Sequence, residues 1–141
     1  MAPAGTTPPH RGGGGRRLPR SGRVTSEPVR VEKPWGHELI MERNDDFVVK
    51  RILLRAGHRS SLQLHVRKRE WVIVEAGQVE LTIGADPQAL EVRTLQAGGV
   101  YRVPPGTVHR VLAVDDATIL EIATPGDDDI VRLDDDYGRG T

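Results

Sequence analysis

The sequence contains no cysteine, which excludes disulfide bonds and thiolate metal sites and leaves histidine and carboxylate as strong metal ligands. Basic and acidic residues number 20 each, so no net field draws the whole molecule to nucleic acid or to an anionic membrane. No apolar run is long enough to cross a bilayer, and the N-terminus lacks the apolar centre of a secretory signal. We therefore expect a soluble cytoplasmic protein without nucleic-acid or membrane partners.

The chain length of 141 residues suits one compact domain plus a tail. Residues 1–27 are rich in glycine, proline and arginine and contain no acidic residue before Glu27. Such a segment buries too little apolar surface to order itself, so we predict a disordered tail followed by a single domain at 28–141. The tail arginines could also contact RNA or phosphate, but no aromatic residues are interleaved with them, which favours a solvated tail.

Short β-branched stretches separated by glycine, proline, asparagine and aspartate follow the tail. Examples are FVVKRILL at 47–54, EWVIVEA at 70–76 and QVELTIG at 78–84. Several short strands at close spacing, with no pattern for a long helix, predict an all-β sandwich or barrel.

One strand-like segment places two metal-binding side chains on the same face. Side chains alternate across a strand, so Gln63 and His65 point to one face of the segment SSLQLH at 60–65. Glu70 begins the next strand-like run. If the connection at 67–69 folds that run back beside the first, the Glu70 carboxylate approaches the His65 imidazole.

A second histidine is expected in the same interior. His109 follows a Pro-Pro-Gly turn at 104–106 that would direct the next strand inward. Two neutral imidazoles, one carboxylate and the Gln63 amide oxygen would form a mixed nitrogen and oxygen site for one divalent metal ion. Zinc is the first candidate, and iron, manganese, nickel and cobalt remain possible. The alternative is that these four are ordinary polar side chains with hydrogen-bond partners.

The motif spacing resembles that of a known superfamily. The pattern Gly57-x5-Gln63-x-His65-x4-Glu70-x6-Gly77 resembles the first cupin motif, with glutamine in place of its first histidine. The pattern Gly98-x5-Pro104-x-Gly106-x2-His109 resembles the second. The resemblance implies the cupin double-stranded β-helix, a jelly-roll β-barrel, and it implies that the metal ligands are Gln63, His65, Glu70 and His109.

A narrower resemblance covers most of the predicted domain. VEKPWGHE at 31–38, VPPGTVHR at 103–110 and DDDIVRLDDDYGR at 127–139 are similar to the C-terminal isomerase domain of type II mannose-6-phosphate isomerases. This resemblance implies the interconversion of fructose 6-phosphate and mannose 6-phosphate, a reaction of carbohydrate metabolism. In that family the domain is often fused to a mannose-1-phosphate guanylyltransferase, and we expect a stand-alone domain here because no phosphate-binding strand-loop-helix pattern precedes it.

An isomerisation through an enediolate needs a base, a positive centre and a clamp for the phosphate. Lys68, Glu121 and His37 are each candidate bases, and the sequence does not choose among them; the last two could equally be structural. The candidate cationic groups for the phosphate are Arg67, Lys68, Arg69, Arg110, Arg132 and Arg139. The cluster at 67–69 could also be a solvated turn.

Some positions depart from the family pattern. Val66, Arg67 and Lys68 stand where the family usually has two histidines and an arginine, the family's tryptophan is displaced to Trp71, and Ala123 replaces a common glutamine. Two alternatives therefore stay open: a different metal-dependent cupin enzyme, such as an iron-dependent oxygenase or a lyase, and a non-catalytic sugar-binding cupin.

The apolar pattern also predicts a homodimer. With Gln63 and His65 inward, Leu62, Leu64 and Val66 should face outward, and WVIV at 71–74 is apolar on both sides of its strand. The segment VRVEKPWGHELIM at 29–41 would cover this outer face of a partner, or would fold back on its own barrel.

Overall fold

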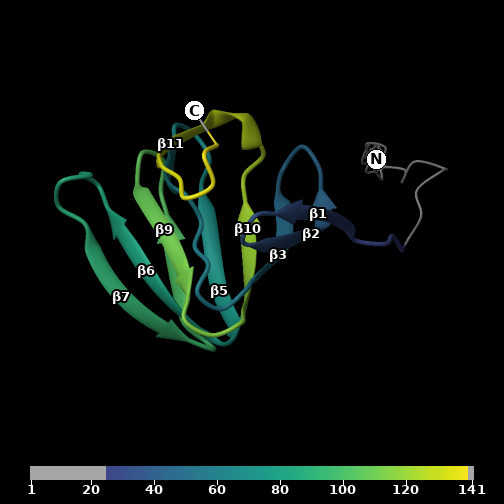
Figure 1. Ribbon diagram of the computed structural model, residues 1–141. Coiled ribbons are helices and arrows are strands. Elements are labelled where there is room, and N and C mark those ends of the chain that lie inside the picture. The colour runs from purple at the N-terminus through teal and green to yellow at the C-terminus, as the bar shows by residue number, and fades with distance from the viewer. Residues whose placement is uncertain (1–24, 140–141) are drawn as a thin grey trace, which may run out of the picture.

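The computed structural model describes residues 25–139, which form two antiparallel sheets stacked face to face (Figure 1). The six-stranded sheet has the order β1 (Val29–Lys33), β2 (Gly36–Arg43), β3 (Val48–Leu54), β10 (Ala117–Ala123), β5 (Glu70–Ala76) and β8 (Val100–Val103). The five-stranded sheet has the order β11 (Ile130–Asp134), β4 (Leu62–His65), β9 (Val108–Ala113), β6 (Gln78–Gly84) and β7 (Glu91–Gln96). The predicted all-β jelly-roll barrel is confirmed.

One short 3-10 helix, η1 (Asp127–Asp129), leads into β11. Over the part of the chain that the structure describes, no helix is long and apolar enough to cross a membrane. Residues 1–24 of the predicted tail at 1–27 lie outside the described part of the chain.

The connection between β4 and β5 differs from the predicted hairpin. β4 pairs with β9 and β11, whereas β5 pairs with β10 and β8 in the other sheet. Residues 66–69 therefore cross from one sheet to the other, and the predicted pairing of these two strands is wrong. His65 and Glu70 still meet, because they face each other across the interior of the barrel.

The apolar core fills one part of this interior. Its buried residues come from both sheets and from the β1–β2 turn: Trp35, Ile52, Leu54, Val72, Val74, Val79, Val111, Ala113, Ala117 and Ile119. Full burial of one large apolar side chain stabilises the fold by about 1.5–3 kcal/mol. The strand β3 shows the alternation behind this core, because Val48, Lys50, Ile52 and Leu54 are buried and the residues between them are half-buried. Lys50 is the one charged residue among these four.

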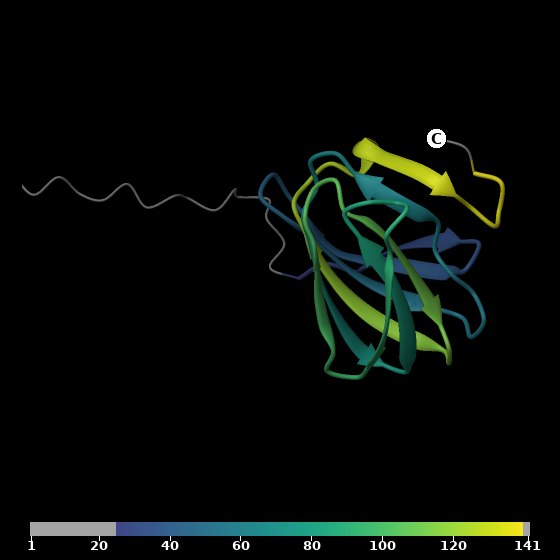
Figure 2. The ribbon, with the colours of Figure 1, turned by 90° about the vertical axis from the view of Figure 1, so that its left-hand side faces the viewer.

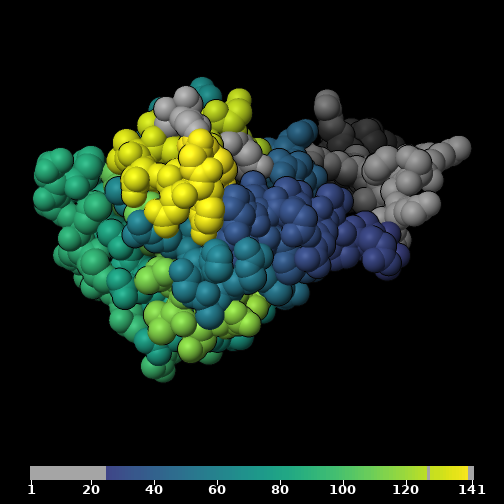
Figure 3. Space-filling view, in the orientation of Figure 1, coloured from purple at the N-terminus to yellow at the C-terminus, as the bar shows by residue number. Residues whose placement is uncertain are grey.

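The remaining interior is a cavity of about 280 Å³. Its lining includes Val31 of β1, Ile40 of β2 and Ile130 of β11, so the first and last strands of the described chain both contribute to it. Figure 2 shows β11 on the same side of the barrel as β1 and β2. In the space-filling view the C-terminal segment (yellow) lies beside these N-terminal strands (Figure 3).

The outward apolar residues lie on two different faces. Leu62, Leu64 and Val66 belong to or follow β4 in the five-stranded sheet, whereas Trp71 and Ile73 lie on β5 in the six-stranded sheet. The prediction that these residues share one outer face is therefore wrong. The segment at 29–41 pairs with β3 of its own chain, which is the alternative to covering a partner.

The homodimer stays a prediction, and we now assign it to the outer face of the six-stranded sheet. Trp71, Val100 and Ile122 are 47%, 56% and 38% exposed there, and the Cα atoms of Ile122 and Trp71 are partners across β10 and β5. Ile122→Glu is expected to convert the dimer to a monomer in light scattering while metal content is kept, because it places a charge in this apolar patch. Val92→Glu, on the exposed side of β7, is the control. A wild-type monomer at micromolar concentration would contradict the prediction.

Candidate metal centre

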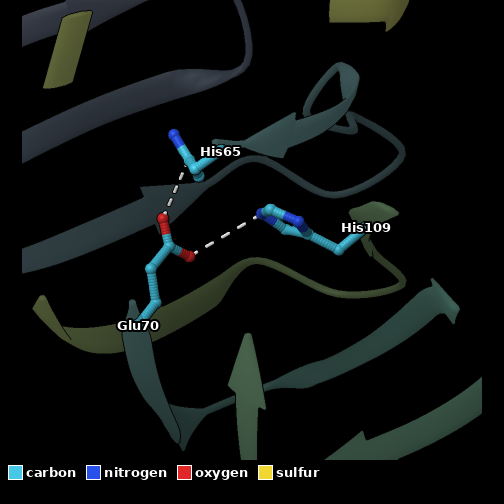
Figure 4. A group of neighbouring side chains, drawn as sticks. All are labelled: His65, Glu70 and His109. Atoms are coloured by element: carbon cyan, nitrogen blue, oxygen red, sulfur yellow. Dashed lines mark ion pairs between the residues drawn. The ribbon is translucent and has the colours of Figure 1, made fainter. Parts of the chain in front are cut away.

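Three buried side chains from three strands converge at one point of the cavity (Figure 4). His65 ends β4, Glu70 begins β5 and His109 is the second residue of β9. Their ligand atoms all lie within 4.8 Å of one another. Glu70 sits between the imidazoles, with Oε1 at 3.0 Å from Nε2 of His65 and Oε2 at 3.7 Å from Nε2 of His109.

Both imidazoles use their Nδ1 atoms elsewhere. Nδ1 of His109 is 3.0 Å from the carbonyl oxygen of Thr107, and Nδ1 of His65 is 3.0 Å from Oδ1 of Asp129. Because both partners are acceptors, each Nδ1 carries the hydrogen, and in the neutral ring each Nε2 has a lone pair. A metal-binding histidine characteristically has its second ring nitrogen held in this way.

The surroundings of the Nε2 atom of His65 show whether a metal ion would fit this site. This atom is buried and has no hydrogen-bond partner within residues 25–139, although Oε1 of Glu70 lies 3.0 Å away. A buried polar atom without a partner is costly in a dry interior. A divalent cation bound by this lone pair, the His109 lone pair and the Glu70 carboxylate would satisfy it, and this donor set is typical of zinc and other borderline divalent ions. The residues therefore fit a metal.

Gln63 lies beside this cluster. Its Cα is paired with that of His109 across β4 and β9, and the side chain lines the cavity. The Ser61 hydroxyl donates a hydrogen bond of 2.6 Å to Oε1 of Gln63. This bond orients the amide and leaves the oxygen with a second lone pair.

Asp129 is a candidate positioning residue that the sequence reasoning missed. Its side chain is 6% exposed, and its Oδ2 accepts hydrogen bonds from the backbone N–H groups of Arg67 at 2.7 Å and Lys68 at 2.9 Å, while Oδ1 accepts from His65. Burial opposes the charged form, but these hydrogen bonds outweigh it and hold the pKa of Asp129 below its usual value. The terminal DDDIVR motif was the available signal, although nothing in it indicates which residue it contacts.

A lysine and two glutamates form a buried group next to the histidines. Nζ of Lys68 lies 3.2 Å from Oε1 of Glu70 and 3.7 Å from Oε2 of Glu121. Burial favours the neutral form of Glu70, but the contact with His65 and the charge of Lys68 lower its pKa to about 2. Burial, with the nearby Glu70 charge, raises the pKa of Glu121 to about 7 against the opposing effect of Lys68 and Lys50.

Two of the predicted phosphate ligands reach the cavity from the C-terminal segment. Arg132 on β11 lines the cavity, and its buried Nε has no hydrogen-bond partner among the residues described. Arg139 also lines it, and its guanidinium donates to Asp135 at 2.9 and 3.0 Å.

Four other predicted residues are not in the cavity lining. His37 neighbours Glu38 on β2, and the alternation of the strand turns Glu38 inward and His37 away. Arg67 and Arg69 are exposed. Arg110 is buried, but it donates to the carbonyl oxygen of Ser60 at 3.0 Å and to Asp134 at 3.0 Å, which binds the C-terminal segment to the barrel.

The cavity also contains polar residues that the sequence reasoning did not single out. Glu38, Lys50 and Tyr101 line it from β2, β3 and β8. Lys50 could have been noticed, because it interrupts an otherwise apolar set of alternate residues in β3.

The sequence and the fold of this chain are similar to those of known proteins. A family model described as "Mannose-6-phosphate isomerase C-terminal" matches residues 22–135. The xanthan biosynthesis protein XanB of Xanthomonas campestris pv. campestris is 34% identical over 115 residues, which are 78% of this chain. The alginate biosynthesis protein AlgA of Pseudomonas aeruginosa is 35% identical over 121 residues, or 82% of this chain. The chain spans about a quarter of the length of these relatives, since each alignment covers 24% of the relative.

Solved structures share the fold at low sequence identity. KdgF from Halomonas sp. is 20% identical with a TM-score of 0.62, covering 72% of this chain and 91% of that chain. Oxalate decarboxylase from Bacillus subtilis is 16% identical with a TM-score of 0.66, covering 79% of this chain and 33% of that chain. At these identities the likenesses confirm the cupin fold alone.

Proposed function

Because the chain belongs to the family of mannose-6-phosphate isomerase C-terminal domains, we propose that it is a metal-dependent isomerase of a phosphorylated sugar. Fructose 6-phosphate and mannose 6-phosphate are the first substrates to test. The observation that carries the proposal is the convergence of His65, Glu70 and His109 inside a cavity that Arg132 also lines. This arrangement combines a site for a cation with a site for an anionic group.

The metal would be held by the Nε2 atoms of His65 and His109 and by the Glu70 carboxylate, with Gln63 as a fourth ligand. When bound, it supplies a positive centre for the oxygen atoms of the enediolate. Zinc is the first candidate, and manganese is a second because Mn(II) centres are described for Bacillus subtilis oxalate decarboxylase, which shares the fold.

Glu121 is the base that the geometry favours. It is buried, it lines the cavity, and its Oε2 lies 3.7 Å from Nζ of Lys68. A carboxylate in this position can take the proton from one carbon of the open-chain sugar and return it to the adjacent carbon. Lys68 can orient the carboxylate and stabilise its charged form. His37 has no comparable position, because it points away from the cavity.

Arg132 is the first candidate for the phosphate. Its guanidinium presents a buried donor without a protein partner in the described chain, as an anion-binding group should before its ligand arrives. Arg139 is a second candidate, although Asp135 already accepts two of its hydrogen bonds. Arg67 and Arg110 lie outside the cavity lining.

Most departures from the family pattern lie away from the cavity. Val66, Arg67 and Trp71 are exposed, and Ala123 is not among the lining residues. Lys68 is the departure that contacts the proposed metal ligand Glu70 and the candidate base Glu121. This supports an isomerase more than a protein that has lost the reaction.

The test is conversion of mannose 6-phosphate to fructose 6-phosphate by the metal-loaded protein, followed by NMR. We expect conversion that stops on chelation, returns with added metal, and falls by about 10²–10⁴-fold in Glu121→Gln because the base is lost. Failure of the loaded protein to convert any of a panel of sugar phosphates would reject the proposal. Oxygen-dependent turnover with iron would instead favour a different cupin reaction, and binding without turnover would favour a sugar-binding protein.

A further inference from the structure

Charged side chains alternate along one wall of the cavity. Nζ of Lys50 on β3 is 3.5 Å from Oε2 of Glu38 on β2. On the other side of Lys50, the Cα atoms of Lys50 and Glu121 are partners across β3 and β10. Glu121 in turn contacts Lys68. From β2 to the crossing at 66–69, the charges of the side chains along this wall are therefore negative, positive, negative and positive.

The Glu38–Lys50 pair has a position that fold stability alone does not explain. The side chains are 14% and 7% exposed, and burying two charges costs more free energy than packing two apolar residues of similar volume there. Both residues line the cavity, whereas the next inward residues of β3, Ile52 and Leu54, belong to the apolar core. The pair can therefore face a ligand.

The chemistry of the pair suits hydroxyl groups. A hydroxyl donates one hydrogen bond and accepts others, a carboxylate only accepts, and an ammonium group only donates. A hydroxyl placed against Glu38 and Lys50 can satisfy both functions at once. Tyr101 adds a further group on the same wall, because its Cα is the partner of Val72, which is in turn the partner of Glu121. No hydrogen bond within the described chain uses the Tyr101 hydroxyl.

We propose that Glu38 and Lys50, with Tyr101 on the same wall, form a subsite that binds the hydroxyl groups of an extended polyhydroxylated phosphate. The inference rests on the proposed function, which supplies the sites for the phosphate and for the metal. Neighbouring strands are about 4.8 Å apart, so polar groups on the adjacent strands β2 and β3 have about the spacing of hydroxyl-bearing carbons that are four bonds apart on an extended chain. The subsite recognises the middle of the ligand. Arg132 holds the phosphate, and the histidines lie at the reacting end.

The test compares two phosphates of equal chain length by calorimetry with metal-loaded protein. Sorbitol 6-phosphate carries the hydroxyls on an open chain, and n-hexyl phosphate lacks them. We expect wild-type protein to bind sorbitol 6-phosphate at least tenfold more tightly. Glu38→Met/Lys50→Met should reduce this preference by about tenfold and leave the affinity for n-hexyl phosphate unchanged, because hydrogen bonds to charged groups are lost.

The double substitution removes both charges together, so neither remains buried without its partner. The control is Arg51→Met/Glu75→Met, which removes an ion pair of 3.0 Å on strands of the same sheet but outside the cavity lining. It should keep the wild-type preference. Unchanged metal content in both variants shows that the site is intact.

An unchanged preference in Glu38→Met/Lys50→Met, or no preference in wild-type protein, would overturn the inference. The outcome is separate from that of the proposed function. A protein that shows the preference and isomerises no sugar phosphate keeps the subsite and loses the isomerase proposal. A protein that isomerises mannose 6-phosphate while the variant keeps its preference loses the subsite alone.

Discussion

Replacing His109 with alanine is expected to reduce bound metal from close to one ion per chain to nearly none. The substitution removes one of two imidazole ligands and leaves Glu70 facing a single histidine across the cavity. Melting temperature should fall as well, because a ligand that binds only the folded state adds its binding free energy to stability, about 4 kcal/mol at a thousandfold excess over Kd. Metal is measured by elemental analysis after reconstitution, and stability by thermal unfolding with and without chelator.

His58→Ala is the matched control for this experiment. His58 is half-buried outside the cavity, with Nδ1 at 3.2 Å from the carbonyl oxygen of Ala56, and its removal should leave metal content unchanged. The chelator should lower the melting temperature of wild-type and His58→Ala protein but not that of His109→Ala. Wild-type protein that takes up no metal on reconstitution would reject the metal centre altogether.

Asp129→Asn is expected to weaken metal binding by about 10–100-fold without removing any ligand. The Asp129 carboxylate meets three donors, the backbone N–H groups of Arg67 and Lys68 and the Nδ1 hydrogen of His65. An asparagine has the same shape, but its NH₂ group must face one of these donors, so one hydrogen bond becomes a repulsive contact. Affinity is measured by competition with a chromophoric chelator.

A purely structural role for Asp129 can be distinguished by spectroscopy. The ¹⁵N chemical shifts of the His65 ring should report a mixture of tautomers in Asp129→Asn and a single tautomer in wild type. Asp128→Asn, an exposed neighbour in the same 3-10 turn, should change neither the shifts nor the affinity. Wild-type affinity in Asp129→Asn would mean that the carboxylate does not position the metal ligand.

Alternation along single strands predicted which side chains share a face. Gln63 and His65 both line the cavity because they are two residues apart in β4, and the turn at 104–106 places His109 opposite Gln63. Glycine and proline spacing, together with the resemblance to cupins, was enough to predict the barrel.

The partners of each strand could not be predicted in the same way. The short connection at 66–69 suggested a hairpin, but hydrogen bonds from its backbone to Asp129 hold it as a crossing between sheets. Asp129, the partner of His65, lies 64 residues further along the chain. A local sequence pattern cannot predict a contact between residues so far apart. Lys50 and Glu38 were overlooked for a related reason, since each is an ordinary charged residue until β2, β3 and β10 are placed together around the cavity.

The pairing of β4 with β11 imposes an order on the folding steps that can occur during synthesis. When His65 leaves the ribosome, Asp129 and the strand that will lie beside β4 have not yet been translated. The nascent chain therefore carries an unpaired strand edge that needs protection from other chains until residues 129–134 emerge. An ion that arrives earlier meets an imidazole whose ring is still free to rotate. Metal loading should accordingly follow the release of β11.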